Sequence, residues 1–286
     1  MKKNTVLICS FVNNSVLLHR MTESERIVIP LLAQMPPITL EEMSAVKLMK
    51  RNDTKYVTNF DTLCDLLRLA HDAGYFVQDI SGNRISHYHT LYWDMPEDHR
   101  YYLIHQQKRK PRIKVRCREY IDSNIGFLEI KRKDNHGKTH KRRVKVPVGL
   151  ESLVASAKER EDFLTEELHL TFDQLIPTLS NRFCRITMVN SGHTERVTID
   201  FELSFHNYEN HVRKQMPGIV IIELKRDGRT ASPMPGLLRQ LRIKPSGFSK
   251  YVIGSAHTNP ELRQNLLKKR LRYYDKVLNR QQAPQQ

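Results

Sequence analysis

The chain has 286 residues, of which 39% are hydrophobic and 27% charged, a composition typical of a soluble globular protein with an apolar core. Its 47 lysines and arginines against 31 aspartates and glutamates give a formal charge of +16, which predicts an anionic partner: nucleic acid, a membrane surface or a phosphate-rich small molecule. The four cysteines form no CxxC pair, so neither a disulfide framework nor a zinc ribbon is expected, and a cytoplasmic location is predicted. No apolar run reaches the length of about 18 residues that crosses a bilayer, so no transmembrane segment is expected.

Residues 1–37 show little periodicity and end in MPP, a natural break before a folded domain. They are interpreted as a flexible N-terminal extension or as an overlong start-site assignment. The opening MKKNTVLICSFVNNSVLLHR imitates a signal peptide, but Asn13 and Asn14 interrupt its apolar run, so export is not favoured. The folded domain is expected to span residues 38–280.

The predicted elements become regular from residue 38 onward. Thr39 followed by two glutamates suits a helix start, RNDTKYV has the pattern of a strand, and NFDTLCDLLRLAHDAG has helical spacing that stops at Gly74. Seven segments of period-2 alternation follow: HYHTLYWD, RIKVRCREY, GFLEIKRKD, HKRRVKVPV, RFCRITMVN, RVTIDFELSF and GIVIIELKR. A helical insert at about 149–176 separates the fourth from the fifth, and a basic helix at about 260–279 closes the chain. The pattern predicts one α+β domain of mostly antiparallel strands.

Several of these strands carry like charges on one face. In RIKVRCREY, Arg112, Lys114, Arg116 and Arg118 alternate with apolar residues, and cationic faces recur in FLEIKRK and THKRRVKV. A single such strand is ordinarily a sheet face in water, but an open face usually mixes both charge signs because like neighbours repel. A closed barrel would instead gather the cations in a lumen. Because removing a cation from water costs several kcal/mol, that lumen must be hydrated or filled by a polyanion, and a chain of phosphates is the predicted occupant.

The motifs LMKRNDTKYV, KVRCREY, FLEIKRK, KTHKRRV, ERVTIDFEL, VIIELK and GFSKYVIG occur in the order of the vacuolar transporter chaperone (VTC) domain, which the chain resembles over about residues 38–256. That family belongs to the CYTH-like, triphosphate tunnel metalloenzyme superfamily. The resemblance implies an α+β fold built on an antiparallel eight-stranded β-barrel, the triphosphate tunnel, with helices packed outside. It also implies an ATP-dependent polyphosphate polymerase. Such an enzyme transfers the γ-phosphoryl of ATP to a growing inorganic polyphosphate chain, with Mn²⁺ or Mg²⁺ as cofactor.

The resemblance also assigns roles to individual residues. Catalytic roles near the transferring group fall to Lys55, Arg116, Arg118 and Lys250. Phosphate or nucleotide binding falls to Lys131, Lys141, Arg185, Arg196 and Ser249, and also to Arg51 and Lys225, which share strand faces with Lys55 and Glu223. Glu223 matches the family's metal-binding carboxylate, and the inward strand positions expected of Glu129 and Glu202 make them further metal candidates.

One departure bears on the reaction. Hydrolytic branches of the superfamily open with an ExExK strand whose glutamates hold metal for attack by water, whereas Arg51 and Asp53 stand at those places here. This difference favours transfer over triphosphatase chemistry. A triphosphatase, and a non-catalytic module that binds polyphosphate or nucleotide, are the alternatives.

Two other signals are weaker. Specific nucleic-acid binding is not expected, because the strand faces mostly lack aromatic platforms between their cations. His87 and His89 have no third histidine at ligand spacing, so ordinary hydrogen bonding is expected of them rather than zinc binding. The sequence indicates no protein partner.

Overall fold

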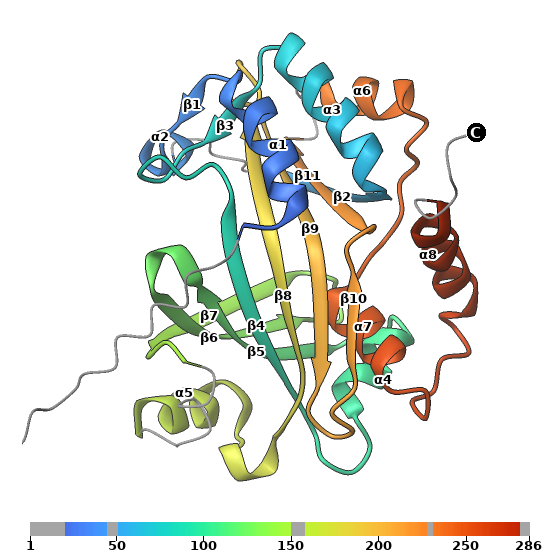
Figure 1. Ribbon diagram of the computed structural model, residues 1–286. Helices are drawn as coiled ribbons and strands as arrows, with labels where there is room; N and C mark the ends of the chain where they lie inside the picture. Colours follow the sequence, from blue (N-terminus) through green and yellow to red (C-terminus); the bar gives the residue numbers. More distant parts are fainter. Residues whose placement is uncertain (1–20, 45–50, 150–157, 228–230, 281–286) are drawn as a thin grey trace, which may run out of the picture.

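The computed structural model describes residues 21–44, 51–149, 158–227 and 231–280. Eight strands form one antiparallel path in the order β2-β11-β9-β8-β4-β5-β6-β7 (Figure 1). Three short strands attach to it: β1 pairs in parallel with β3, β3 pairs with β8, and β10 pairs with β9. The strands are β1 (Pro37–Ile38), β2 (Arg51–Thr58), β3 (Phe76–Gln78), β4 (Ser86–Asp94), β5 (Arg112–Tyr120), β6 (Ile125–Lys133), β7 (Thr139–Val146), β8 (Ile176–Val189), β9 (Glu195–Asn207), β10 (Arg213–Met216) and β11 (Val220–Asp227).

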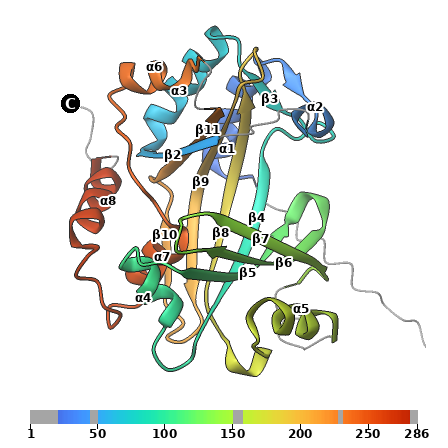
Figure 2. The same cartoon turned by 180° about the vertical axis from the view of Figure 1, so that it is seen from behind.

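The path curls until its two edges, β2 and β7, approach each other. In Figures 1 and 2, β5, β6 and β7 cross the long strands β8 and β9 as a second layer. Asp53 and Thr54 of β2 line a hollow of about 600 Å³ together with Thr139 at the start of β7. No ladder joins β2 to β7 among the described residues. The predicted α+β fold with an eight-stranded antiparallel tunnel is therefore confirmed, as a barrel-like sheet whose hydrogen-bonded ladder does not close.

Helices, and two short 3₁₀ turns within the described ranges, pack around the sheet. Among the described residues, no helix has both the length and the apolar composition that crossing a bilayer requires. The bounds are α1 (Glu23–Ala33), α2 (Leu40–Ser44), α3 (Phe60–Asp72), α4 (Arg100–Gln106), η1 (Ile121–Ser123), α5 (Lys158–Leu168), η3 (Phe172–Gln174), α6 (Met234–Gln240), α7 (Lys250–Thr258) and α8 (Lys268–Arg280).

The outer face of the sheet carries the apolar half of each alternating strand and is covered by helices. α3 lies over this face because its leucines follow the helical repeat, and Asn59 caps its first turn by accepting from the Thr62 N–H at 2.9 Å. Leu63 and Leu67 of α3 share one buried cluster with Ile199 of β9 and its neighbours on β8 and β11. This packing leaves the charged half of each strand to face the interior of the curl, which we call the inner face.

Residues 21–37, which belong to the expected N-terminal extension, are part of the packed structure. Thr22 caps α1, and Val28 and Leu32 of α1 are fully buried in the same cluster as α3. The break indicated by MPP therefore lies within the fold, because α1 presents an apolar stripe that the sheet and α3 cover. Residues 1–20 lie outside the described part of the chain.

The expected helical insert at about 149–176 contains α5 and η3, while residues 150–157 lie outside the described part. Phe163 and Leu164 of α5 pack on the outer face with Val115 of β5 and Leu128 of β6. The insert therefore covers the half of the barrel wall that α1, α3 and α6 do not reach.

One end of the inner face is filled by α7, which the strand and helix patterns did not single out. Tyr251 and Ile253 of α7 are buried against Leu179 of β8 and Phe205 of β9. Within the range expected for a closing basic helix, α8 begins at Lys268 rather than near residue 260, and it lies against the same cluster through Tyr274. The inner face is consequently apolar and plugged at the α7 end and charged beyond it.

Candidate active site

Strand register places the predicted cations side by side on the inner face. Lys55 of β2 lies opposite Glu223 of β11, and Arg116 of β5 lies opposite Glu129 of β6. Arg185 of β8 pairs with a carboxylate of β9 in the same way. Since alternate residues of a strand face the same side, these pairs fix which members of each strand point inward.

A row of three lysines crosses the inner face. Lys114 of β5 lies directly opposite Lys131 of β6, which lies directly opposite Lys141 of β7. Like charges in directly opposed cross-strand positions destabilise a sheet. The row is therefore an arrangement that a bound polyanion would stabilise.

Charged side chains on strands that are far apart in the sheet influence each other across the curl. Lys55 and Lys114 stand on β2 and β5, which are separated by four other strands along the path. Burial and the neighbouring Arg116 lower the pKa of Lys114 well below its ordinary value, and the Lys55 ammonium adds to that effect. The charges of β2 and β5 therefore act on each other across the interior of the curl.

Asp200 of β9 joins two of the predicted cations at the α7 end. Arg185 grips it with both nitrogens of its fork, Nε to Oδ1 at 2.6 Å and Nη2 to Oδ2 at 2.9 Å, and Lys250 of α7 also donates to Oδ2. Burial alone would raise the pKa of Asp200, but these two cations hold it well below its usual range. Burial and Arg185 in turn lower the pKa of Lys250 to about 7, although Asp200 opposes that shift. The inward position of Asp200 was visible in the strand pattern, but its two partners come from elements far apart in the sequence.

Glu129, a predicted metal ligand, is committed to two cations. Arg116 donates to its Oε2 through Nη2 at 2.6 Å and through Nε at 2.7 Å, and Lys141 pairs with Oε1. The glutamate is fully buried; burial raises its pKa, but the charges of Arg116 and Lys141 lower it to about 2. A metal ion at Glu129 would have to displace both partners, so this residue fits a structural role on the inner face better.

Glu223 is held more loosely and fits a divalent cation best. Its ion pairs with Lys225 and Lys55 measure 3.1 and 3.7 Å, and its side chain is 20% exposed, against 0% for Glu129. Burial raises its pKa, but Lys55 and Lys225 bring it to about 2, so the group is ionised. Mg²⁺ is commonly held by one or two carboxylates together with substrate phosphates, and a single loosely paired glutamate on the inner face meets that requirement.

Arg118 and Lys131 are inward cations that have no ion pair among the described contacts. Arg118 donates from Nε to the Thr90 hydroxyl at 3.1 Å, and its guanidinium lies 5.5 Å from the centre of the Tyr88 ring. Burial, together with the charge of Arg116, lowers its pKa to about 10. Lys131 has a pKa of about 7, lowered by burial and by Arg116. Neither side chain has a carboxylate partner that a phosphate oxygen would have to displace.

The other predicted site residues occupy different places. Arg196 of β9 lies opposite Lys225 on the inner face. Ser249 is the N-cap of α7, accepting from the Val252 N–H at 3.4 Å, so its contact is structural. Arg51 begins β2 opposite Asp227, and its side chain lies outside the described part of the chain.

Glu202 does not point inward, contrary to the expectation from alternation. The ladder between β8 and β9 shifts register between Arg182 and Cys184, and Glu202 has a left-handed φ of 53°. This bulge turns its side chain to the outer face, where it accepts a hydrogen bond from Ser24 of α1. The three predicted metal carboxylates are therefore not brought together.

Comparisons with known proteins found a matching family and several solved structures. The sequence model of the VTC domain matches residues 50–259. Among solved structures, a candidate adenylate cyclase from Bacillus halodurans is 14% identical, with a TM-score of 0.44 over 70% of this chain and 96% of that one. A candidate adenylyl cyclase from Hippeastrum, described as having a dominant triphosphatase activity, is 15% identical, with a TM-score of 0.45 over 73% of this chain and 97% of that one. No curated protein matches the sequence. Because the family match covers well over half of the chain and includes every strand of the eight-stranded path, the chain belongs to the VTC domain family.

Proposed function

We propose that the protein is an ATP-dependent polyphosphate polymerase that elongates inorganic polyphosphate on its inner face. The observation that carries the proposal is the convergence of cations from opposite walls of the curl, including the row of Lys114, Lys131 and Lys141. Membership of the VTC domain family supports a substrate made of linked phosphates. A linear chain of phosphates would place negative charges along such a row. It is also narrower than a nucleic acid duplex.

The reaction asks the protein mainly for positioning and charge neutralisation. The γ-phosphorus of ATP forms a bond to a terminal oxygen of the polyphosphate chain, and its bond to the bridging oxygen breaks as ADP leaves. Arg118 and Lys131 bind phosphate oxygens, and Arg185 is held in a fixed orientation by Asp200. Lys250 donates to the same carboxylate of Asp200 as Arg185 does. Lys55 adds charge from the opposite edge strand.

Glu223 is the residue that would hold Mg²⁺ or Mn²⁺, shared with the substrate phosphates. When bound, such a cation neutralises charge on phosphate oxygens as a Lewis acid. Lys55 and Lys225, which flank Glu223, then keep the nucleotide phosphates near that carboxylate.

Incubation of the purified full chain with ATP and Mn²⁺ or Mg²⁺ tests the proposal. We expect a ladder of phosphate chains on a gel and stoichiometric ADP, both lost when the cation is chelated. Release of free phosphate without a ladder would identify a triphosphatase, and retention of polyphosphate without ATP turnover would identify a binding module; either result refutes polymerisation.

A carboxylate variant separates the metal site from general charge effects. Glu223→Gln keeps the shape of the side chain and removes the ligand, so synthesis should fall and require more cation. Glu167→Gln, in an ion pair with Arg142 at 3.2 Å on the outer helix α5, is the matched control and should leave synthesis unchanged. Equal activity in both variants would exclude Glu223 as the metal ligand.

A further inference from the structure

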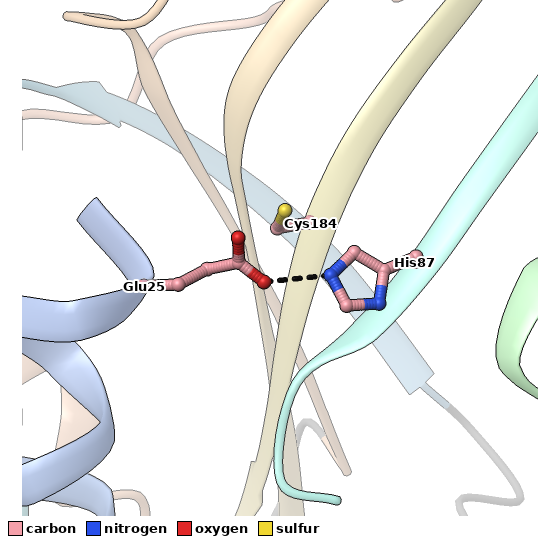
Figure 3. Close-up of side chains that lie close together, drawn as sticks. All are labelled: Glu25, His87 and Cys184. Atoms are coloured by element: carbon pink, nitrogen blue, oxygen red, sulfur yellow. Dashed lines mark hydrogen bonds and ion pairs between the residues drawn. The ribbon is translucent and has the colours of Figure 1, made fainter. Parts of the chain in front are cut away.

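A cluster of metal-ligating side chains lies on the outer face, between α1, β4 and β8. Glu25 reaches from α1 toward the His87 ring on β4, and the Cys184 sulfur of β8 lies beside them (Figure 3). One ligand atom from each residue lies within 4.8 Å of the others. Glu25 and Cys184 are buried, at 3% and 4% exposure. Glu25 precedes His87 by 62 positions and His87 precedes Cys184 by 97, so no short sequence motif indicates this cluster.

His87 is oriented by Asp122 of η1. The carboxylate of Asp122 contacts the His87 Nδ1 through Oδ1 at 2.7 Å and accepts from the His87 backbone N–H through Oδ2 at 2.6 Å. With Nδ1 carrying the proton for that contact, Nε2 faces Glu25 Oε1 at 2.7 Å. A carboxylate behind the far nitrogen is the usual support of a metal-bound histidine, because it fixes the tautomer and the ring orientation.

The other oxygen of Glu25 and a neighbouring cavity complete the surroundings of the cluster. Glu25 uses its other oxygen, Oε2, to accept from the Thr22 N–H in the capping box of α1, at 2.8 Å. A cavity of about 340 Å³ adjoins the cluster and is lined by His87, Cys184 and Glu202, among others. Glu202, turned outward by the bulge in β9, lines this cavity but is not one of the three clustered ligands. The cavity has room for a water molecule as the fourth ligand.

We propose that Glu25, His87 and Cys184 bind a zinc ion that clips α1 to β4 and β8. Imidazole nitrogen, thiolate sulfur and carboxylate oxygen are the three donor types that Zn²⁺ accepts in tetrahedral sites, and a thiolate disfavours Mg²⁺ and Ca²⁺. The site is distinct from the proposed active site, which uses hard oxygen donors on the opposite face of the sheet. It does not depend on polymerase activity.

Zinc binding exchanges protons for the metal. Zinc is held by the Cys184 thiolate and by the unprotonated Nε2 of His87. Because protons compete with the metal for both atoms, the affinity for zinc should increase with pH.

The test is titration of the metal-free full chain with Co²⁺ and Zn²⁺ in the absence of nucleotide. One equivalent of Co²⁺ should produce a thiolate-to-metal charge-transfer absorption, which one equivalent of Zn²⁺ abolishes. Zinc should also raise the melting temperature, because it binds the folded chain. Absence of stoichiometric binding would overturn the proposal.

Matched variants locate the site. Cys184→Ala should abolish the charge-transfer absorption, whereas Cys117→Ala, at a buried cysteine of β5, should retain it. His87→Gln should weaken zinc binding more than about 100-fold, and Asp122→Asn, which removes only the orienting carboxylate, about 10- to 100-fold. His89→Gln, on the same strand but bonded to Glu119, should leave the affinity unchanged. Equal affinity in Cys184→Ala, His87→Gln and the wild type would place the metal elsewhere and refute the proposal.

Discussion

The inward cations fall into two groups according to whether a carboxylate pairs with them. Arg116 and Arg185 are clamped on Glu129 and Asp200, while Arg118 has no ion pair among the described contacts. The clamped arginines hold the barrel wall together as well as facing the lumen. A variant of Arg116 or Arg185 can therefore lose activity either through catalysis or through reduced stability. A cation without a carboxylate partner gives a clearer test of the catalytic role.

Arg118→Gln should reduce polyphosphate synthesis more than about 100-fold, a loss equivalent to about 2.7 kcal/mol of transition-state stabilisation, while the fold survives. Its guanidinium is desolvated without a carboxylate partner, so its removal costs little stability. Initial rates of synthesis and urea unfolding of the same sample measure the two effects. A large drop in unfolding free energy with normal synthesis would show that Arg118 is structural.

Arg116→Ala should behave differently from Arg118→Gln. Removal of one partner from a buried ion pair typically costs about 3–5 kcal/mol, because the other charge is left buried with fewer partners. Glu129 is fully buried and would keep only Lys141. Urea unfolding should show this loss, and an unfolding free energy unchanged from the wild type would mean that Glu129 finds a new partner.

Lys131 should give the ligand-free protein a distinctive pH dependence. Burial and Arg116 lower its pKa to about 7, below the ordinary value of 10.5. Below pH about 7 both the folded and the unfolded chain hold the proton, and the cost of burying the charge is fully present. As pH rises from about 7 toward about 10.5, the unfolded chain binds more protons than the folded one, so this contribution raises stability.

The variant Lys131→Met isolates that contribution. It should be more stable than the wild type near neutral pH, and the difference should shrink as pH rises, because the wild-type lysine becomes neutral. Urea unfolding of both proteins across this pH range measures it, and other titrating groups cancel in the comparison. A difference that is constant with pH would mean that Lys131 stays charged. Triphosphate affinity of the wild type should fall over the same range, since binding needs the ammonium.

Among the elements, α7 decides where the inner face ends. Its close approach to the sheet depends on Gly254: a Cβ there would lie 2.8 Å from Leu179 Cδ2 and closer still to the Phe205 ring. Both neighbours are buried and cannot move aside without disturbing the cluster. Because Lys250 stands at the start of the same helix, the position of α7 also sets the contact between Lys250 and Asp200.

Gly254→Ala should destabilise the protein by about 1–3 kcal/mol through overpacking, and should lower synthesis if α7 is pushed outward. Gly236→Ala in α6 is the control, because a Cβ there meets nothing within 4 Å, and alanine in a helix should stabilise by up to about 1 kcal/mol. Melting temperatures of the two variants should move in opposite directions. A neutral Gly254→Ala would show that α7 can shift without cost.

The bulge in β9 is an element-scale feature with consequences for two sites. Up to Asp200 the strand alternates regularly, with Thr198 and Asp200 inward. At Glu202 the left-handed backbone reverses the alternation and sends the carboxylate toward α1. One irregular residue thus removes a carboxylate from the inner face and places it beside the proposed zinc ligands.

At the scale of the whole molecule, the net charge of +16 favours anionic partners in general. The grouping of cations on the inner face of the curled sheet is more specific for polyphosphate. A polyanion bound on the inner face should reduce the electrostatic repulsion between these cations. Polyphosphate at about 100 times its dissociation constant should therefore stabilise the fold by about 2.7 kcal/mol, and the effect should weaken as salt is added.

Thermal unfolding with polyphosphate and with duplex DNA at equal phosphate concentration tests this prediction. The duplex can reach only exposed basic residues, so its effect should be smaller and should not change in Arg118→Gln. The polyphosphate effect should decrease in that variant. Equal stabilisation by both polymers, insensitive to Arg118, would place polyanion binding on the outer surface.

The strands and the inward direction of most site residues follow from the sequence by itself. Alternation is a local property, so Lys55, Arg116, Lys131 and Arg185 could each be assigned to a charged strand face from their immediate neighbours. The same reasoning identified α3 and α8 from helical spacing. The tunnel and the proposed roles of individual residues came from the resemblance to a family, because periodicity does not contain them.

Which side chains contact each other over long sequence distances was decided only by the tertiary structure. Register and curvature bring Asp200 to Lys250 across 50 positions and His87 to Cys184 across the outer face, and neither is encoded in a short window of sequence. Alternation also misplaced Glu202, because a bulge depends on how β9 fits against β8 and not on local propensity. Local chemistry therefore determined which side chains carry charge inward, and long-range packing determined which of them are neutralised by a partner and which are open to a ligand.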